Sequence, residues 1–92
     1  MKRVIDINAT YRAVAIFCAV HGGKNEGKAL ITWDALRERF GISWNTYTNE
    51  LHAKGMLFGG NGYEYLRPEW ADMTPAERME RIKQWYPYPY QR

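Results

Sequence analysis

The stretch "RFGISWNTYTNELHAKGMLFGGNGYEYL", residues 39–66, contains the strongest structural signals in the chain. Gly41 can end one helix, and Ser43 can cap the next by accepting a hydrogen bond from a backbone N–H. That next helix is predicted from Trp44 to about Lys54, where a glycine stops it. "MLF" and "YEYL" then form short strands around "GGNG", whose residues tolerate the positive φ angles of a hairpin corner. The stretch therefore predicts a helix, a tight turn, a second helix and a hairpin.

The residues just before this stretch predict the first helix of that pair. In "WDALRERF", Trp33, Leu36 and Phe40 are spaced by three and four residues, so they share one inward face. Thr32 precedes the helix and can cap it, while Asp34 in the first turn suits the helix dipole. The segment "ALIT" is a short strand candidate, and "GGKNEGK" before it is a polar loop.

The segment "NATYRAVAIFCAVHGG" predicts a long helix near the start of the chain. Asn8 or Thr10 can cap it, and Gly22 with Gly23 can end it in a left-handed turn. Apolar residues occupy most of its circumference, which predicts burial on most sides, Val20 included. A buried strand is the alternative, because period alone does not classify short apolar runs.

At the other end, "TPAERMERIKQWY" begins with a capping box formed by Thr74 and Glu77, with proline at the first helical position. Met79, Ile82 and Tyr86 form one stripe of this helix, and its basic residues, Arg78 among them, are expected elsewhere. The stripe favours packing on the core, and a separate dimerisation helix is the alternative. The tail "WYPYPYQR" is expected to be extended, with its tyrosines folding back on the domain or gripping a partner.

Composition narrows the class of protein. The chain has 92 residues, of which 46% are apolar and 25% charged, and this fits one globular domain. The longest apolar run, residues 13–20, is too short for a bilayer, and we expect no secretory signal, hence a cytoplasmic location. Cys18, the single cysteine, is expected in the core. The net charge of +3 is compatible with a nucleic-acid partner but does not require one.

The predicted order of helix, strand, helix, glycine turn, helix and hairpin resembles the winged helix-turn-helix family of DNA-binding domains, including its compact excisionase-type variant with a short reading helix. The resemblance rests on Leu36, Phe40, "GIS", Tyr47, Leu51, "KGMLF" and "GGNGYEYL". The resemblance covers roughly residues 11–66 and implies a mainly helical domain with a small hairpin wing. We expect this domain to span residues 1–73, with the C-terminal helix and extended aromatic tail, residues 74–92, packed on it or extending from it. The resemblance also implies that Ile42 plugs the core between the paired helices.

In that family the second helix of the pair enters the major groove and the wing lies against the backbone or minor groove. The residues expected to face DNA are Ser43, Trp44, Asn45, Thr46, Thr48, Asn49 and His52. Phosphate contacts are expected from Lys28, Arg37, Arg39 and Lys54, from Lys2 and Arg3, and from the backbone near Asn61 in the wing. The reading helix carries no arginine, and Glu64 in the wing works against a phosphate contact.

Interpretations that do not involve DNA stay open for these residues. The polar face of the reading helix is also typical of a solvated surface, and Trp44 either covers the core edge or anchors a partner. We expect a small regulator of transcription or recombination that binds double-stranded DNA, of a size that suits a phage or mobile element. The resemblance to small winged regulators also implies a homodimer. The competing interpretation is a protein-interaction module that uses Trp44 or the tyrosine tail. No enzyme, metal or cofactor motif is found. His21 and His52 lack the spacing of metal ligands, and the glycine-rich loop "GGKNEGK" lacks the GK[ST] ending of a phosphate-binding loop.

Overall fold

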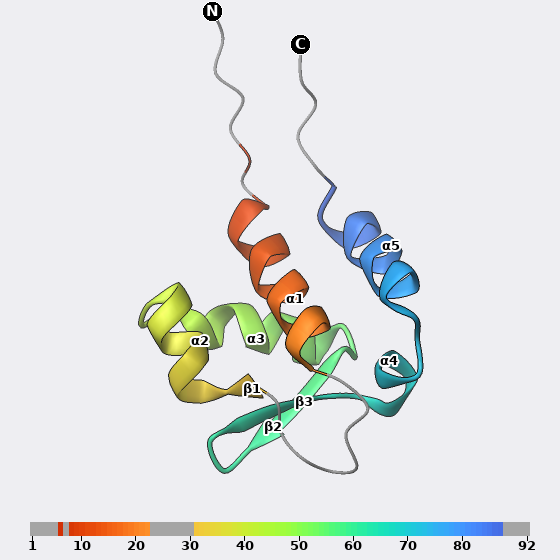
Figure 1. Ribbon diagram of the computed structural model, residues 1–92. Helices are drawn as coiled ribbons and strands as arrows, with labels where there is room; N and C mark the ends of the chain where they lie inside the picture. Colours follow the sequence, from red (N-terminus) through yellow and green to blue (C-terminus); the bar gives the residue numbers. More distant parts are fainter. Residues whose placement is uncertain (1–5, 7, 23–30, 88–92) are drawn as a thin grey trace, which may run out of the picture.

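The computed structural model describes Asp6, residues 8–22 and residues 31–87. It contains five helices and three strands in these parts, in the order α1 (Ala9–His21), β1 (Ile31–Thr32), α2 (Trp33–Phe40), α3 (Trp44–Ala53), β2 (Leu57–Gly60), β3 (Tyr63–Leu66), α4 (Pro68–Ala71) and α5 (Pro75–Trp85) (Figure 1). The fold is therefore mainly helical with a small antiparallel sheet. The helix expected for the first apolar run is confirmed and the strand alternative is wrong. Helix α4, just after the hairpin, was not predicted.

The sheet has the order β1-β3-β2, so the last strand of the hairpin lies between the other two. The hairpin corner consists of Asn61 and Gly62, with φ angles of 57° and 88°. Two successive positive φ angles allow a two-residue turn that matches the twist of the strands, which confirms the expected corner. The backbone N–H of Trp33 donates to the carbonyl of Gly62 at 2.9 Å, which ties this corner to the start of α2.

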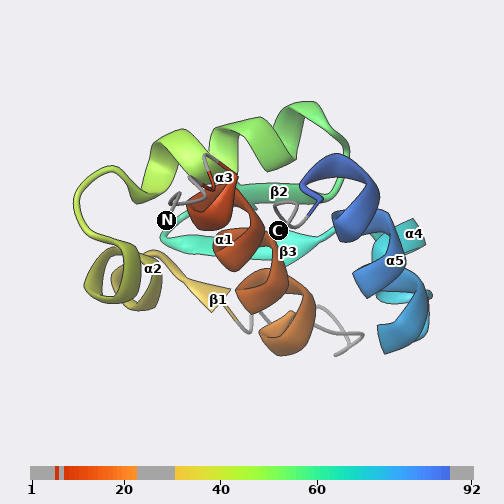
Figure 2. The ribbon, with the colours of Figure 1, turned by 90° about the horizontal axis from the view of Figure 1, so that it is seen from above.

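Helix α1 lies between α3 and α5 and packs against both (Figure 2). Its inward residues, Val14, Ala15 and Cys18, are fully buried. Together with buried residues from the other helices and strands they form the core, whose further members are Ile31, Leu36, Leu51, Met56, Leu57, Leu66, Trp70, Ile82 and Tyr86. The expected core role of Cys18 is confirmed. The prediction that α1 is buried on most sides is wrong for its outer face, where Val20 is 63% exposed.

Helix α5 packs on α1, as its apolar stripe predicted, because Ile82 and Tyr86 are buried there. Its capping box is confirmed: the Thr74 hydroxyl accepts from the N–H of Glu77, and the Glu77 carboxylate accepts from the N–H of Thr74 at 2.8 Å. The Thr32 cap of α2 is confirmed in the same way.

Arg78 on α5 lies in the core, contrary to the sequence prediction. Its guanidinium donates to the carbonyls of Trp70, Ala19 and Ala71, each at 2.9 Å. These carbonyls belong to the ends of α1 and α4, where helices leave acceptors without internal partners. The carbonyls of Ala19 and Ala71 gain a donor in this way, while the Trp70 carbonyl also accepts from the N–H of Met73 at 3.2 Å. The three bonds from the guanidinium offset its loss of hydration in the core.

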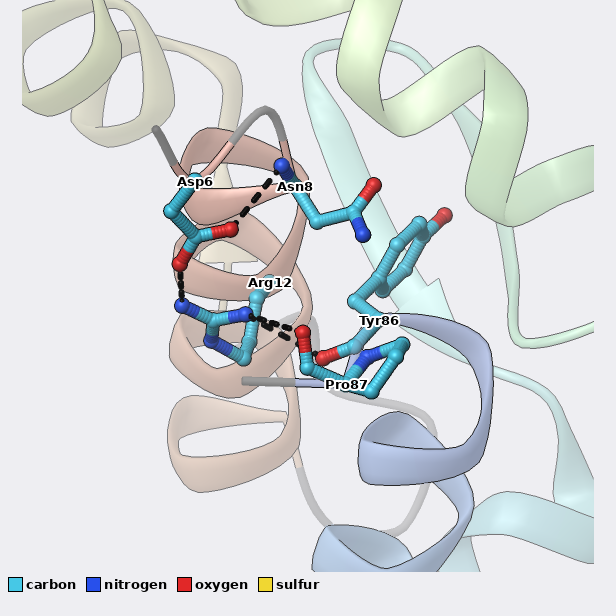
Figure 3. A network of polar contacts seen from close by, with 5 residues as sticks. All are labelled: Asp6, Asn8, Arg12, Tyr86 and Pro87. Atoms are coloured by element: carbon cyan, nitrogen blue, oxygen red, sulfur yellow. Dashed lines mark hydrogen bonds and ion pairs between the residues drawn. The ribbon is translucent and has the colours of Figure 1, made fainter. Parts of the chain in front are cut away.

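A second buried arginine holds the far end of α5 against α1. Arg12 donates to the carbonyls of Tyr86 and Pro87 at 3.2 and 3.0 Å and pairs with the carboxylate of Asp6 (Figure 3). The chain just after α5 is thereby fixed beside the start of α1.

Three expected local features differ in the structure. Asn8 and Ser43 stand at N-cap positions, but neither side chain makes a cap hydrogen bond, and Thr10 lies within α1. Gly22 is extended, with φ −79° and ψ 136°, rather than left-handed. Glycine is required there for space, because a Cβ would lie 2.7 Å from the carbonyl oxygen of Cys18. Gly23 lies outside the described residues.

Ile42 does not plug the space between α2 and α3, since 84% of its surface is exposed. Gly41, with φ 85° and ψ −172°, turns the chain so that the next side chain leaves the core. Leu36 and Leu51 fill the interior, and the rings of Trp33 and Trp44 meet with centroids 5.7 Å apart.

Candidate functional site

One face of α3 remains open to solvent on the side away from α1. Asn45, Thr46 and Asn49 are exposed there, as the sequence predicted. The spacing of four and three residues places Asn45, Asn49 and His52 in one row along the helix. The opposite face holds the buried Leu51. Helix α3 therefore presents a row of polar side chains from a rigid position.

Thr48 is the exception among the expected reading residues. It is only 1% exposed, and its hydroxyl donates to the carbonyl of Asn45 at 3.2 Å. Its spacing of three from Leu51 and four from Trp44 assigns it to the inward face. Thr48 therefore faces inward, and its expected place on the exposed face of α3 is wrong. Trp44 itself is half-buried and packs on Trp33, which agrees with the core-edge interpretation.

A cleft of about 350 Å³ separates α3 from the hairpin. The α3 side contributes Trp44, Asn45, Thr48, Asn49 and His52, and the other side contributes Trp33, Gly59, Gly60 and Glu64. The polar row of α3 thus borders a hollow whose opposite wall includes two glycines of β2. Four of the predicted site residues, Trp44, Asn45, Asn49 and His52, line this cleft together with the buried Thr48. The exposed Ser43 and Thr46 lie near them in sequence.

The floor of the cleft contains a buried carboxylate. Glu64 is 2% exposed, and its Oε2 accepts from the indole Nε1 of Trp33 at 2.9 Å while its Oε1 lies 2.5 Å from Nε2 of His52. The carboxylate also lies against Gly59, where a Cβ would come within 2.3 Å of Oε2. Burial, and next the charge of Glu64, raise the pKa of the Cys18 thiol to about 12. One acidic side chain therefore connects α2, α3 and the hairpin.

From the sequence, Glu64 was expected only as an unfavourable charge in the wing, and this connecting role was not predicted. The signal that identifies it is the alternation of "YEYL". Tyr63 and Tyr65 face outward, so Glu64 and Leu66 must share the buried face, and this is what the structure shows. A buried carboxylate needs donors, and Trp33 and His52 supply them.

The predicted phosphate contacts are spread around the site. Arg37 and Arg39 on α2 are exposed, and the Arg39 guanidinium lies over the ring of Phe17 at 5.2 Å, on the α1 side. Lys54 at the end of α3 lies over the Trp85 ring at 5.3 Å. Asn61 is exposed at the hairpin corner, and Lys28, Lys2 and Arg3 lie outside the described residues. No Lys or Arg is found among the described residues that line the cleft.

The charges of the chain divide unevenly. The described residues hold eight of the thirteen Lys and Arg and nine of the ten Asp and Glu. The excess positive charge therefore belongs, in sequence, to residues 1–5, 23–30 and 88–92. The described residues together carry a formal net charge of −1, from eight basic and nine acidic side chains.

The end of α5 braces the side of α3. The Tyr86 hydroxyl donates to the carboxylate of Glu50, and the Tyr86 ring stacks on Tyr11 of α1 with centroids 5.8 Å apart. Burial, and next the hydrogen bond to Glu50, raise the pKa of the Tyr86 hydroxyl well above its usual range. This tyrosine folds back on the domain, as one of the two interpretations of the tail predicted, and leaves Asn45 and Asn49 uncovered. The tail beyond Pro87 lies outside the described residues.

Within Asp6 and residues 8–22 and 31–87, no group of three or more His, Cys, Asp or Glu side chains is arranged to hold a metal ion. No helix in the same parts of the chain is long and apolar enough to span a membrane. Comparison with family models, with curated proteins and with solved structures found no match for this chain.

Proposed function

We propose that this protein is a winged helix-turn-helix domain that binds double-stranded DNA, with α3 in the major groove and the hairpin beside it. The observation that carries the proposal is the row on α3 of the exposed Asn45 and Asn49 and the half-buried His52, next to the β2–β3 hairpin. A small regulator of transcription or an accessory factor in recombination is the role this arrangement suits. The order of elements and the sheet order β1-β3-β2 support the same proposal.

The size and chemistry of α3 suit a major groove. Its ten residues span about 15 Å, and a major groove of about 12 Å admits one helix. Each Asn amide can donate to and accept from the adenine edge, a pairing worth about 1–3 kcal/mol of discrimination. Since Asn45 and Asn49 are one turn apart on the exposed face, both can contact bases within one site.

Nonspecific affinity has to come from a small set of cations. Arg37, Arg39 and Lys54 are exposed on the described surface, and the sequence adds Lys2, Arg3 and Lys28. With roughly three to six phosphates contacted, log K should fall with log[salt] at a slope between about −3 and −5.

A salt titration of binding to random and genomic duplexes tests this proposal. We expect binding at low salt, with the slope given above. The double variant Asn45→Ala, Asn49→Ala should lose sequence preference and keep the salt slope, whereas Gln84→Ala, an exposed change on α5, should keep both. Absence of binding by the unmodified protein at low salt would exclude the proposal.

A second candidate function is docking to a protein, and one observation favours it. Ile42 is 84% exposed beside the start of α3, and the nearby cleft has two tryptophans in its wall. Exposed apolar residues next to aromatic side chains are typical of contact surfaces. If this candidate is correct, Ile42→Ala should weaken partner binding with little dependence on salt, and DNA binding should be absent.

A further inference from the structure

The Glu64 carboxylate has a defined hydrogen-bond direction toward His52. Its Oε2 is occupied by the Trp33 indole at 2.9 Å, and its Oε1 lies 2.5 Å from Nε2 of His52. An ionised carboxylate only accepts hydrogen bonds, so the histidine must donate from Nε2. In the neutral ring the other nitrogen, Nδ1, then carries no proton and is an acceptor.

The free side of His52 belongs to the polar row of α3. About a third of its side chain is exposed, and it lines the cleft together with Asn49. Nε2 is directed to the buried Oε1, so the ring edge that bears Nδ1 is the one turned away from the carboxylate. When the ring is neutral, the position three residues after Asn49 therefore carries an acceptor, Nδ1, on the ring edge turned away from the carboxylate.

We propose that Glu64 is a positioning residue that holds His52 in the Nε2–H tautomer, so that α3 offers an acceptor to an exocyclic amino group in the major groove. The proposal rests on the proposed function and adds a base class to it. Adenine N6 and cytosine N4 are the amino donors of that groove, whereas guanine O6 and thymine O4 are acceptors. His52 therefore favours adenine or cytosine in the strand it contacts.

The proposal depends on the carboxylate and not merely on a polar side chain of that size. In Glu64→Gln, the amide oxygen still accepts from Trp33, but the amide NH2 faces His52. The ring then has to accept at Nε2, which moves its proton to Nδ1. A single-atom change in the buried group should therefore convert His52 from an acceptor to a donor in the cleft.

The first experiment needs no DNA. Two-bond ¹H–¹⁵N correlation spectra of the histidine rings, at a pH where the rings are neutral, identify which nitrogen carries the proton. We expect the Nε2–H form for His52 in the unmodified protein and the Nδ1–H form in Glu64→Gln. Glu69→Gln, an exposed change of the same kind on α4, should leave His52 unaltered, and exposed His21 is an internal reference. An Nδ1–H ring in the unmodified protein would overturn the proposal, even if Glu64→Gln fails to fold.

The second experiment measures base preference by selection from random duplexes. At one position of the selected site, Glu64→Gln should exchange adenine or cytosine for guanine or thymine, by a factor of roughly 5 to 150 in relative affinity. The salt slope should not change. A purely structural role predicts a uniform loss of affinity with the preference retained, and that result would overturn the proposal. If the unmodified protein binds no duplex at low salt, the DNA-binding proposal fails separately, and the tautomer spectra still decide whether Glu64 orients His52.

Discussion

Replacing Gly59 by alanine should disrupt the floor of the cleft, because the three atoms nearest to the added Cβ all belong to Glu64. Gly59 pairs with Glu64 across the hairpin, and a Cβ at this position would lie 2.3 Å from Oε2, 2.6 Å from Cδ and 2.8 Å from Oε1. Ordinary contact begins near 3.4 Å. The carboxylate must therefore move by about 1 Å, and a shift of this size breaks or greatly weakens its hydrogen bonds.

The energetic cost follows from the two bonds that are lost or weakened. A hydrogen bond to a charged group contributes about 1.5–3 kcal/mol, and Glu64 accepts two of them in a buried position. Because part of this is regained when the carboxylate finds water in the cleft, we expect Gly59→Ala to lower the free energy of unfolding by about 2–4 kcal/mol. For a domain of this size that corresponds to a fall in Tm of roughly 10–25 °C.

Gly60 provides the matched control, since a Cβ at this neighbouring position of the same strand would meet nothing within 4 Å. Gly60→Ala should therefore change the stability by less than about 1 kcal/mol. Urea unfolding followed by tryptophan fluorescence measures both variants. In the double variant Gly59→Ala, Glu64→Ala the cost of the two changes should not add, because the clash is gone. Equal stability of the two single glycine variants would refute the close approach of Glu64 to β2.

Three further outcomes are expected. Arg78→Met should lower the free energy of unfolding by about 3–5 kcal/mol in chemical denaturation, because three carbonyls lose the hydrogen bond from the guanidinium. Tyr86→Phe should lower the free energy of unfolding by about 1–3 kcal/mol in the same measurement, because the Glu50 carboxylate loses the hydroxyl that donates to it. Burial raises the pKa of Cys18 from 9.0 to about 12, so the unfolded chain releases this proton first and stability should fall as pH rises from about 9 toward 12. Cys18→Ala should flatten that part of the pH profile, and an unchanged profile would contradict the assigned burial of the thiol.

Much of the local structure follows from short-range signals. Thr32 and Thr74 cap helices because their hydroxyls reach an N–H three residues ahead, and such contacts need no tertiary partner. The corner at Asn61 and Gly62 is predictable for the same reason, since few residue types adopt positive φ at low cost. The polar row on α3 also follows from helical periodicity.

The wrong predictions concern residues whose burial depends on distant parts of the chain. Arg78 was expected away from the apolar stripe of α5, but the carbonyls of Ala19, Trp70 and Ala71 at the ends of α1 and α4 accept its hydrogen bonds and hold it in the core. Ile42 was expected in the core, but Gly41 turns its side chain outward, and Leu36 and Leu51 fill the interior. Neither result can be predicted from the charge or the apolarity of that residue alone.

The amino-acid sequence by itself determined the positions of the main helices, the hairpin and the exposed face of α3, because caps, turns and helical period act over a few neighbouring residues. Only the tertiary structure decided that Glu64 lies beneath the cleft with Trp33 and His52, since these residues are separated by 12 and 31 positions along the chain. Their meeting depends on how the hairpin packs against α2 and α3, and a buried carboxylate is stable there only because both donors arrive together.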